Sequence, residues 1–174
     1  MAMSPGVRRF VLVAHLSFSV GWIGAVLAYL GLGVAAQTST DALTVRAAWI
    51  GMELVGWYVL VPLAVTSLVT GVVMALGTRW GLFRHYWVVF SFALTVFATA
   101  VLLLHMPTVS STAEVAREAD STRLVALGGD LVHPGIGLVV LLVVLVLNLY
   151  KPRGLTGYGR RRVDERRAQP VVDS

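Results

Sequence analysis

The chain has 174 residues, of which 57% are hydrophobic and 13% charged, and its mean hydropathy is +0.79. Soluble domains contain about 25% charged residues, so this composition indicates a protein that crosses a membrane several times. The absence of cysteine excludes disulfides, thiolate metal ligands and thiol nucleophiles. The net charge of +5 does not indicate nucleic-acid binding, because the Lys and Arg residues flank apolar runs, where they act as topology signals.

Two long apolar runs occupy the first half of the chain. Residues 10–36 follow a short head, residues 1–9, and this run is far longer than the apolar region of a signal peptide, about 7–15 residues, so we expect a retained span. A polar loop separates it from a second run, residues 47–76, which exceeds the about 20 residues that a span needs. Pro62 lies near the middle of the second run and predicts a kink there.

The second half of the chain contains two further apolar runs, residues 86–105 and residues 131–150. Between them we expect an outer loop over residues 107–130 that contains a short surface helix. Ser111 and Glu114 have the spacing of a capping box, which is typical of a helix start.

The four runs predict an all-α fold, an antiparallel bundle of four transmembrane helices across residues 10–150, followed by a basic tail, residues 151–174, with a disordered end. Of the 14 Lys and Arg residues, Arg46, Arg117 and Arg123 fall on one side of this bundle, and all the others fall on the opposite side. Because cytoplasmic loops carry the excess of Lys and Arg, we expect a multi-pass protein of the cell membrane with both termini in the cytoplasm. We also expect the basic tail to contact anionic lipids of the bilayer.

Glu53 is the one ionisable residue of the second run, and a carboxylate at the centre of a span costs about 2.5–3.5 kcal/mol. At a rise of about 1.5 Å per residue, Glu53, His105 and His133 fall in one layer, about 11–14 Å to the outer side of the span centres. Asp130 falls just above this layer and Met106 beside it. Two imidazoles and a carboxylate suit copper or zinc. The sequence therefore predicts an outer-leaflet transition-metal site formed by Glu53, His105 and His133.

The histidines also allow a different cofactor. Two His residues from different spans can be the axial ligands of haem b, with His105 and His133 as the main pair and His15 and His85 as a weaker inner pair. His85 and His105 are separated by about 30 Å on a straight helix, so they cannot share one site. This alternative describes an electron-transfer membrane protein.

A third interpretation assigns no ligand to these side chains. Glu53 and the outer histidines lie within about one turn of the interface, where they can reach water and lipid head groups at small cost. The chain would then be an accessory subunit that packs through Gly21 and Gly24 of the first span, in a homo-oligomer or against a partner membrane subunit. The sequence contains no nucleophile elbow, HExxH motif or glycine-rich phosphate loop, so we expect a protein that is not an enzyme.

Three strings of the sequence point to a family: AHLSFSVGWIGA at residues 14–25, WGLFRHYW at residues 80–87, and YKPRGLT at residues 150–156. Through them the chain resembles small, uncharacterised four-helix integral membrane proteins of actinobacterial type. This resemblance covers nearly the whole chain and implies the same fold and topology. The spacing of His15 from Gly21-Trp22 and Gly24 is also similar to that in the first span of copper-resistance membrane proteins of the CopD type, which favours copper among the metals without implying particular ligands.

Overall fold

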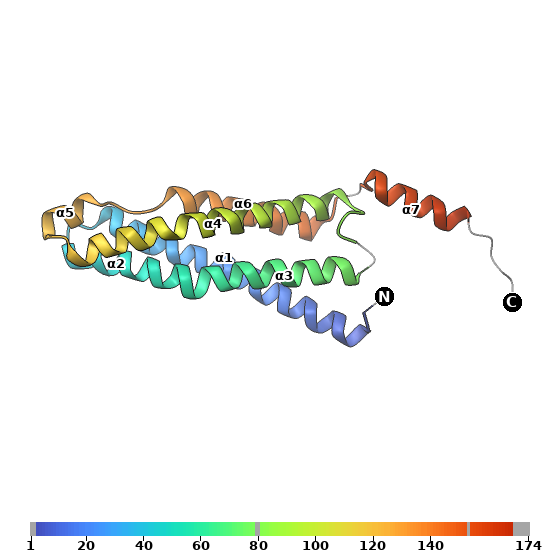
Figure 1. Ribbon diagram of the computed structural model, residues 1–174, viewed down its shortest axis with the longest axis horizontal. Coiled ribbons are helices and arrows are strands. Elements are labelled where there is room, and N and C mark those ends of the chain that lie inside the picture. Colours follow the sequence, from blue (N-terminus) through green and yellow to red (C-terminus); the bar gives the residue numbers. More distant parts are fainter. Residues whose placement is uncertain (1–2, 79–80, 153, 169–174) are drawn as a thin grey trace.

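A computed structural model describes residues 3–78, 81–152 and 154–168 of the chain, which form long helices packed side by side (Figure 1). The elements are α1 (Pro5–Thr38), α2 (Ala42–Val55), the π-helical turn η1 (Gly56–Leu60), α3 (Val61–Gly77), α4 (Tyr86–Glu118), α5 (Ser121–Ala126), α6 (Val132–Tyr150) and α7 (Gly157–Ala168). The segments α2, η1 and α3 continue as one helix, which together with α1, α4 and α6 gives four helices long and apolar enough to cross a membrane. The predicted all-α bundle of four transmembrane helices is therefore confirmed.

The bundle has two different ends. At one end α1 and α4 finish, α2 and α6 begin, and the short helix α5 lies between α4 and α6; we call it the α5 end (Figure 1). At the opposite end α1 begins, α6 finishes, and a connection joins α3 to α4; we call it the terminal end. Figure 1 shows the first turns of α1 diverging from α4 and α6 as they approach the N-terminus.

Short polar residues set the starts of three helices. The hydroxyl of Ser4 accepts a hydrogen bond from a backbone N–H in the first turn of α1, and the carboxylates of Asp41 and Asp120 do the same for α2 and α5. These bonds satisfy donors that have no partner within the helix. Pro5 follows Ser4 at the first helical position, where its missing N–H costs nothing.

The second span is irregular next to Pro62. The π-helical turn Gly56–Leu60 ends directly before α3, whose first turn contains Pro62. Proline cannot donate to the preceding turn, so the helix widens there rather than continuing as a regular α-helix. Gly56 within this turn has no side chain, and the thioether of Met106 occupies the space that a Cβ would need. The structure thus has a π turn next to Pro62, and the Met106 thioether packs against Gly56 within that turn.

The expectation of a loop over residues 107–130 is wrong for its first half, because α4 continues through Pro107 to Glu118. Ser111 and Glu114 consequently lie inside this helix rather than at a helix start. The cost of an internal proline is offset by packing, since the next turns of α4 bury apolar side chains against α2. The buried residues are Val109, Ala113 and Ala116 of α4, and Val45, Ala48, Trp49 and Met52 of α2. The short helix of this region is α5, which Asp120 caps.

Burial is concentrated toward the α5 end. The largest fully buried side chains are Tyr29, Met52, Met106, Leu124, Val45 and Val109. Toward the terminal end a smaller cluster packs around Ala75, Trp87 and Val88. Of the two glycines of α1 that were expected to pack against another helix, Gly21 faces Leu63 of α3, whereas a Cβ on Gly24 would meet open space.

The basic tail begins against the connection between α3 and α4. The backbone N–H of Thr156 donates to the carbonyl of Arg84 at 3.0 Å, and the hydroxyl of Thr156 donates to the carbonyl of Phe83 at 2.5 Å. Helix α7 follows. The end of the tail that we expect to be disordered lies outside the described residues from residue 169 onward.

Candidate metal centre

Three potential ligands meet at the α5 end of the bundle. His105 comes from α4, Asp130 from the loop before α6, and His133 from the first turn of α6. One ligand atom from each residue lies within 4.8 Å of the other two. This group joins two elements far apart in the sequence, and we refer to it as the His–Asp–His group.

Asp130 is the central member of the group. Its Oδ2 lies 2.7 Å from Nε2 of His105 and accepts a hydrogen bond from the hydroxyl of Tyr29 at 3.2 Å. Because a carboxylate can only accept, Nε2 of His105 carries the shared hydrogen in this arrangement. Oδ1 of Asp130 lies 3.5 Å from Nδ1 of His133. The side chain of Asp130 is only 9% exposed, so this carboxylate depends on its three partners.

The loop that carries Asp130 is fixed against α1. A Cβ on Gly33 would lie 2.6 Å from the carbonyl oxygen of Asp130, and one on Gly129 would lie 2.0 Å from the carbonyl oxygen of Gly33. Backbone therefore rests directly on backbone, which only glycine permits at this distance. The N–H of Gly129 also donates to Oε1 of Gln37 at 2.8 Å, and the indole of Trp49 donates to the carbonyl of Gly128 at 3.0 Å. These contacts determine where the Asp130 carboxylate lies.

The two imidazoles lie face to face. The ring centroids of His105 and His133 are 3.9 Å apart, and the ring planes are tilted by 20°. The His105 side chain is 17% exposed and the His133 side chain 53% exposed. One imidazole is thus held inside the bundle, while the other remains accessible from outside.

A cavity of about 230 Å³ lies beside the group, between α1, α4 and α6. Tyr29 and the His–Asp–His group supply its polar atoms, and the remaining wall is apolar, with Trp22, Phe97 and Leu141 among its residues. Met106, which the sequence placed beside the layer, is fully buried and packs against Gly56. Electrostatic interactions are strong in such poorly hydrated surroundings.

Glu53 does not join the group. Its carboxylate pairs with the guanidinium of Arg117 near the end of α4, and it is absent from the cavity wall. The sequence placed Glu53 at the same depth in the membrane as the histidines. Its side chain, however, points in a different direction around the axis of α2 and meets Arg117 instead. Asp130 takes the place in the His–Asp–His group that the sequence assigned to Glu53.

The inner histidines occupy separate environments. Nδ1 of His15 lies 3.1 Å from the hydroxyl of Thr70, and the His15 ring lies over Gly71 of α3. His85 precedes the first turn of α4, with its ring centroid 6.5 Å from that of Trp87. His15 lines a cavity between the spans, and His85 is not part of that wall.

The His–Asp–His group has the chemistry of a metal site. Zinc binds imidazole nitrogen and carboxylate oxygen at about 2.0–2.2 Å, so two ligands of one ion are at most about 4.4 Å apart. The three ligand atoms, within 4.8 Å of one another, approach this limit, and the half-exposed His133 side chain is the one that can close the difference. An ion would replace the hydrogen shared by His105 and Asp130.

The sequence did contain a signal for Asp130. It lies three residues before His133, and the depth arithmetic placed it just above the predicted layer. What the sequence lacked was the direction of the carboxylate, which the contact of the loop with α1 decides. Comparisons with protein-family models, curated proteins and solved structures gave no match.

Proposed function

We propose that this protein is a metal-binding membrane protein whose site is formed by His105, Asp130 and His133. The observation that supports the proposal is the convergence of two imidazoles and a carboxylate at one end of the bundle, beside a cavity whose remaining wall is largely apolar. Ionisable groups inside transmembrane bundles are costly, and they mark functional sites when they face one another. The Tyr29 hydroxyl is an outer-shell partner of the carboxylate and orients it.

The donor set favours zinc or copper(II) over the other candidates. Imidazole nitrogen suits both ions, and carboxylate oxygen is a common zinc ligand. The stacked rings argue against haem b at this pair, because two axial imidazoles must approach iron from opposite faces of the macrocycle.

The site lies on the outer side of the cell membrane in the orientation that we propose. The α5 end carries Arg46, Arg117 and Arg123, while the remaining Lys and Arg residues belong to the terminal end and the tail. The positive-inside rule then places both termini in the cytoplasm. The basic tail meets the anionic inner leaflet, at about 1 kcal/mol for each cation near the surface. The His–Asp–His group therefore takes its ion from the extracytoplasmic solution.

Metal titration of the purified protein in detergent tests the site. We expect about one zinc or copper ion per chain, and a loss of affinity of more than about 100-fold in His105→Ala and in His133→Ala. Loss of a residue that only hydrogen-bonds to a metal ligand already lowers metal affinity by about 10–100-fold, so loss of a ligand itself is expected to lower it further. Competition between the two ions in the same titration determines which of them the site prefers.

Glu53→Gln is the matched control, because it removes a carboxylate at the same end of the bundle but outside the His–Asp–His group. We expect its metal affinity to equal that of the unchanged protein. Retention of full affinity in both histidine variants would refute the proposed site. If only Glu53→Gln lost metal affinity, Glu53 would be a metal ligand, as the sequence predicted.

The proposed orientation can be tested separately, since the chain contains no cysteine. Ser121→Cys at the start of α5 and Gly157→Cys at the start of α7 introduce single thiols at exposed positions of the two ends. In intact cells a membrane-impermeant maleimide is expected to label the first and not the second. The reverse pattern would place the His–Asp–His group in the cytoplasm.

A further inference from the structure

A second cavity lies toward the terminal end of the bundle, in the part of the molecule that the metal proposal does not use. Its volume is about 430 Å³, which is within the range of about 300–1,000 Å³ typical of small-molecule sites. Residues of α1, α3, α4 and α6 form its wall, so all four spans contribute to it. We call it the four-span cavity.

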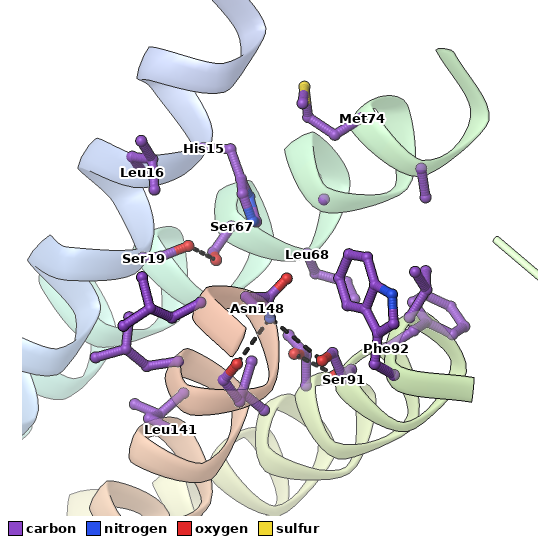
Figure 2. Close-up of a pocket in the computed structure, with 18 of the residues that line it drawn as sticks. His15, Leu16, Ser19, Ser67, Leu68, Met74, Ser91, Phe92, Leu141 and Asn148 are labelled. Atoms are coloured by element: carbon purple, nitrogen blue, oxygen red, sulfur yellow. Dashed lines mark hydrogen bonds between the residues drawn. The ribbon is translucent and has the colours of Figure 1, made fainter. Parts of the chain in front are cut away.

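Polar side chains face the four-span cavity from two opposite walls (Figure 2). On the α1–α3 wall, the hydroxyls of Ser19 and Ser67 lie 2.8 Å apart, next to His15. On the α4–α6 wall, the amide nitrogen of Asn148 donates to the hydroxyl of Ser91 at 3.2 Å and to a backbone carbonyl of its own helix. Each wall therefore presents a small hydrogen-bonding cluster inside the membrane-spanning region.

These clusters can both donate and accept. A serine hydroxyl rotates to serve either role, and an amide has both a carbonyl oxygen and an N–H₂ group. The hydroxyl of Thr70 donates to the carbonyl of Thr66, so it accepts from Nδ1–H of His15. The neutral His15 ring then keeps its other nitrogen, Nε2, as an acceptor. Figure 2 shows the ring of His15 close to Ser67, on the same wall.

The rest of the wall is apolar and partly aromatic. Trp22, Trp87 and Phe92 contribute ring surfaces. Among the residues that line the cavity, Lys151 at the terminal end is the one that carries a permanent charge. An occupant of this cavity is thus expected to have a flat, uncharged polar head.

The cavity opens toward lipid between α1 and α6. Leu16 and Val20 of α1 and Leu145 and Leu149 of α6 belong to its wall, yet their exposed fractions are between 43% and 73%. Figure 1 shows that α1 leans away from α6 in this half of the bundle. An apolar mouth at this depth gives access to acyl chains rather than to water. The occupant is therefore expected to arrive from the membrane and to leave an apolar tail in this gap.

From these features we infer that the four-span cavity binds the head group of a membrane-dissolved para-quinone. A para-quinone has two carbonyl oxygens on opposite edges of one flat ring, which match the polar clusters on the opposite walls. Its isoprenoid tail fits the mouth between α1 and α6. The reduced quinol finds acceptors at His15 and Asn148, so both forms of the head group can be held. The inference concerns binding alone and does not depend on the metal site.

Titration of the purified protein with a short-tailed benzoquinone and a short-tailed naphthoquinone tests this inference. Trp22 and Trp87 line the cavity, so saturable quenching of tryptophan fluorescence reports binding. We expect Asn148→Leu, and separately Ser67→Ala, to weaken quinone binding by about tenfold or more, the effect of losing a hydrogen bond in an apolar site. An aromatic hydrocarbon with the same tail is the matched ligand control, and it is expected to bind weakly to every variant.

Metal affinity at the α5 end provides the folding control for these variants, because Asn148 and Ser67 lie in the other half of the bundle. A variant that keeps its metal affinity, or its thermal stability if no metal binds, but loses quinone binding supports the inference. Equal quinone affinity in the unchanged protein, Asn148→Leu and Ser67→Ala would overturn it. A purified protein that retains phospholipid which neither quinone displaces would also overturn it, in favour of an ordinary acyl chain in the cavity.

Discussion

The cavity beside the His–Asp–His group and the four-span cavity share part of their walls and differ in chemistry. Trp22 of α1 and Leu141 of α6 line both of them. The cavity at the α5 end contains the ionisable His–Asp–His group, whereas the four-span cavity contains hydroxyls, an amide and one imidazole, with Lys151 at its terminal end.

Ionisable side chains are least costly near a membrane interface, where water reaches at least one of them, as it does His133. Neutral polar groups inside the spans satisfy one another or the backbone of their own helix, as Asn148 does with Ser91 and Val144. The two proposals accordingly assign an ion from solution to the first cavity and an uncharged molecule from the bilayer to the second. The predictions below test how independent these two regions are.

The largest expected effect is that of Asp130→Asn on metal binding. The substitution keeps the size of the side chain but removes the carboxylate charge between His105 and Tyr29. We expect metal affinity to fall by more than about 100-fold while quinone binding in the four-span cavity stays unchanged. A parallel loss of quinone binding would show that the two regions depend on each other.

The second prediction concerns the close approach of Gly33 to the loop before α6. In Gly33→Ala the new methyl group meets backbone at 2.6 Å, so the loop must move. We expect a loss of about 1–3 kcal/mol in the free energy of unfolding, with weaker metal binding because Asp130 moves with the loop. The control is Gly31→Ala in the same helix, where a Cβ meets nothing within 4 Å. This control is expected to be neutral or slightly stabilising when thermal unfolding is measured in detergent.

A smaller effect is expected for the ion pair between Glu53 and Arg117, which lies at the same end of the bundle as the His–Asp–His group. The Arg117 side chain is 42% exposed and that of Glu53 18%, so water screens much of the attraction. A double-mutant cycle with Glu53→Gln and Arg117→Ala should give a coupling energy of about 0.2–1 kcal/mol. A coupling several times larger would contradict the assignment of Glu53 to a partly solvated pair.

The smallest effect is expected at Asp41, the cap of α2. Hydrogen bonds from the side chain and backbone of Thr44, and from the backbone of Leu43, lower the pKa of this carboxyl. A carboxyl with a lowered pKa stabilises the fold above its ordinary pKa of about 4, and this contribution is lost as the pH falls through the lower pKa of the folded state. Asp41→Asn keeps a capping side chain but removes this acid dependence. Plots of the free energy of unfolding against pH for the unchanged protein and Asp41→Asn should therefore differ in shape below about pH 4. Two curves separated by the same amount at every pH would contradict the prediction.

The sequence by itself determined the spans and the depth of their polar residues. Apolar runs long enough to cross a bilayer define four helices whatever their neighbours, and the rise along a helix fixes how deep each residue lies. His105 and His133 were therefore placed correctly at one level. The cap at Asp41 and the irregularity before Pro62 are likewise local properties of the chain.

Only the tertiary structure decided which polar side chains meet. The direction of a side chain around its helix depends on which helices pack together, so Glu53 turned out to face Arg117 rather than the histidines. The extension of α4 beyond Pro107 depends on burial against α2, which no local pattern predicts. Asp130 entered the His–Asp–His group because glycine at positions 33 and 129 lets its loop rest on α1. Depth is a property of one helix, whereas a site requires the packing of several.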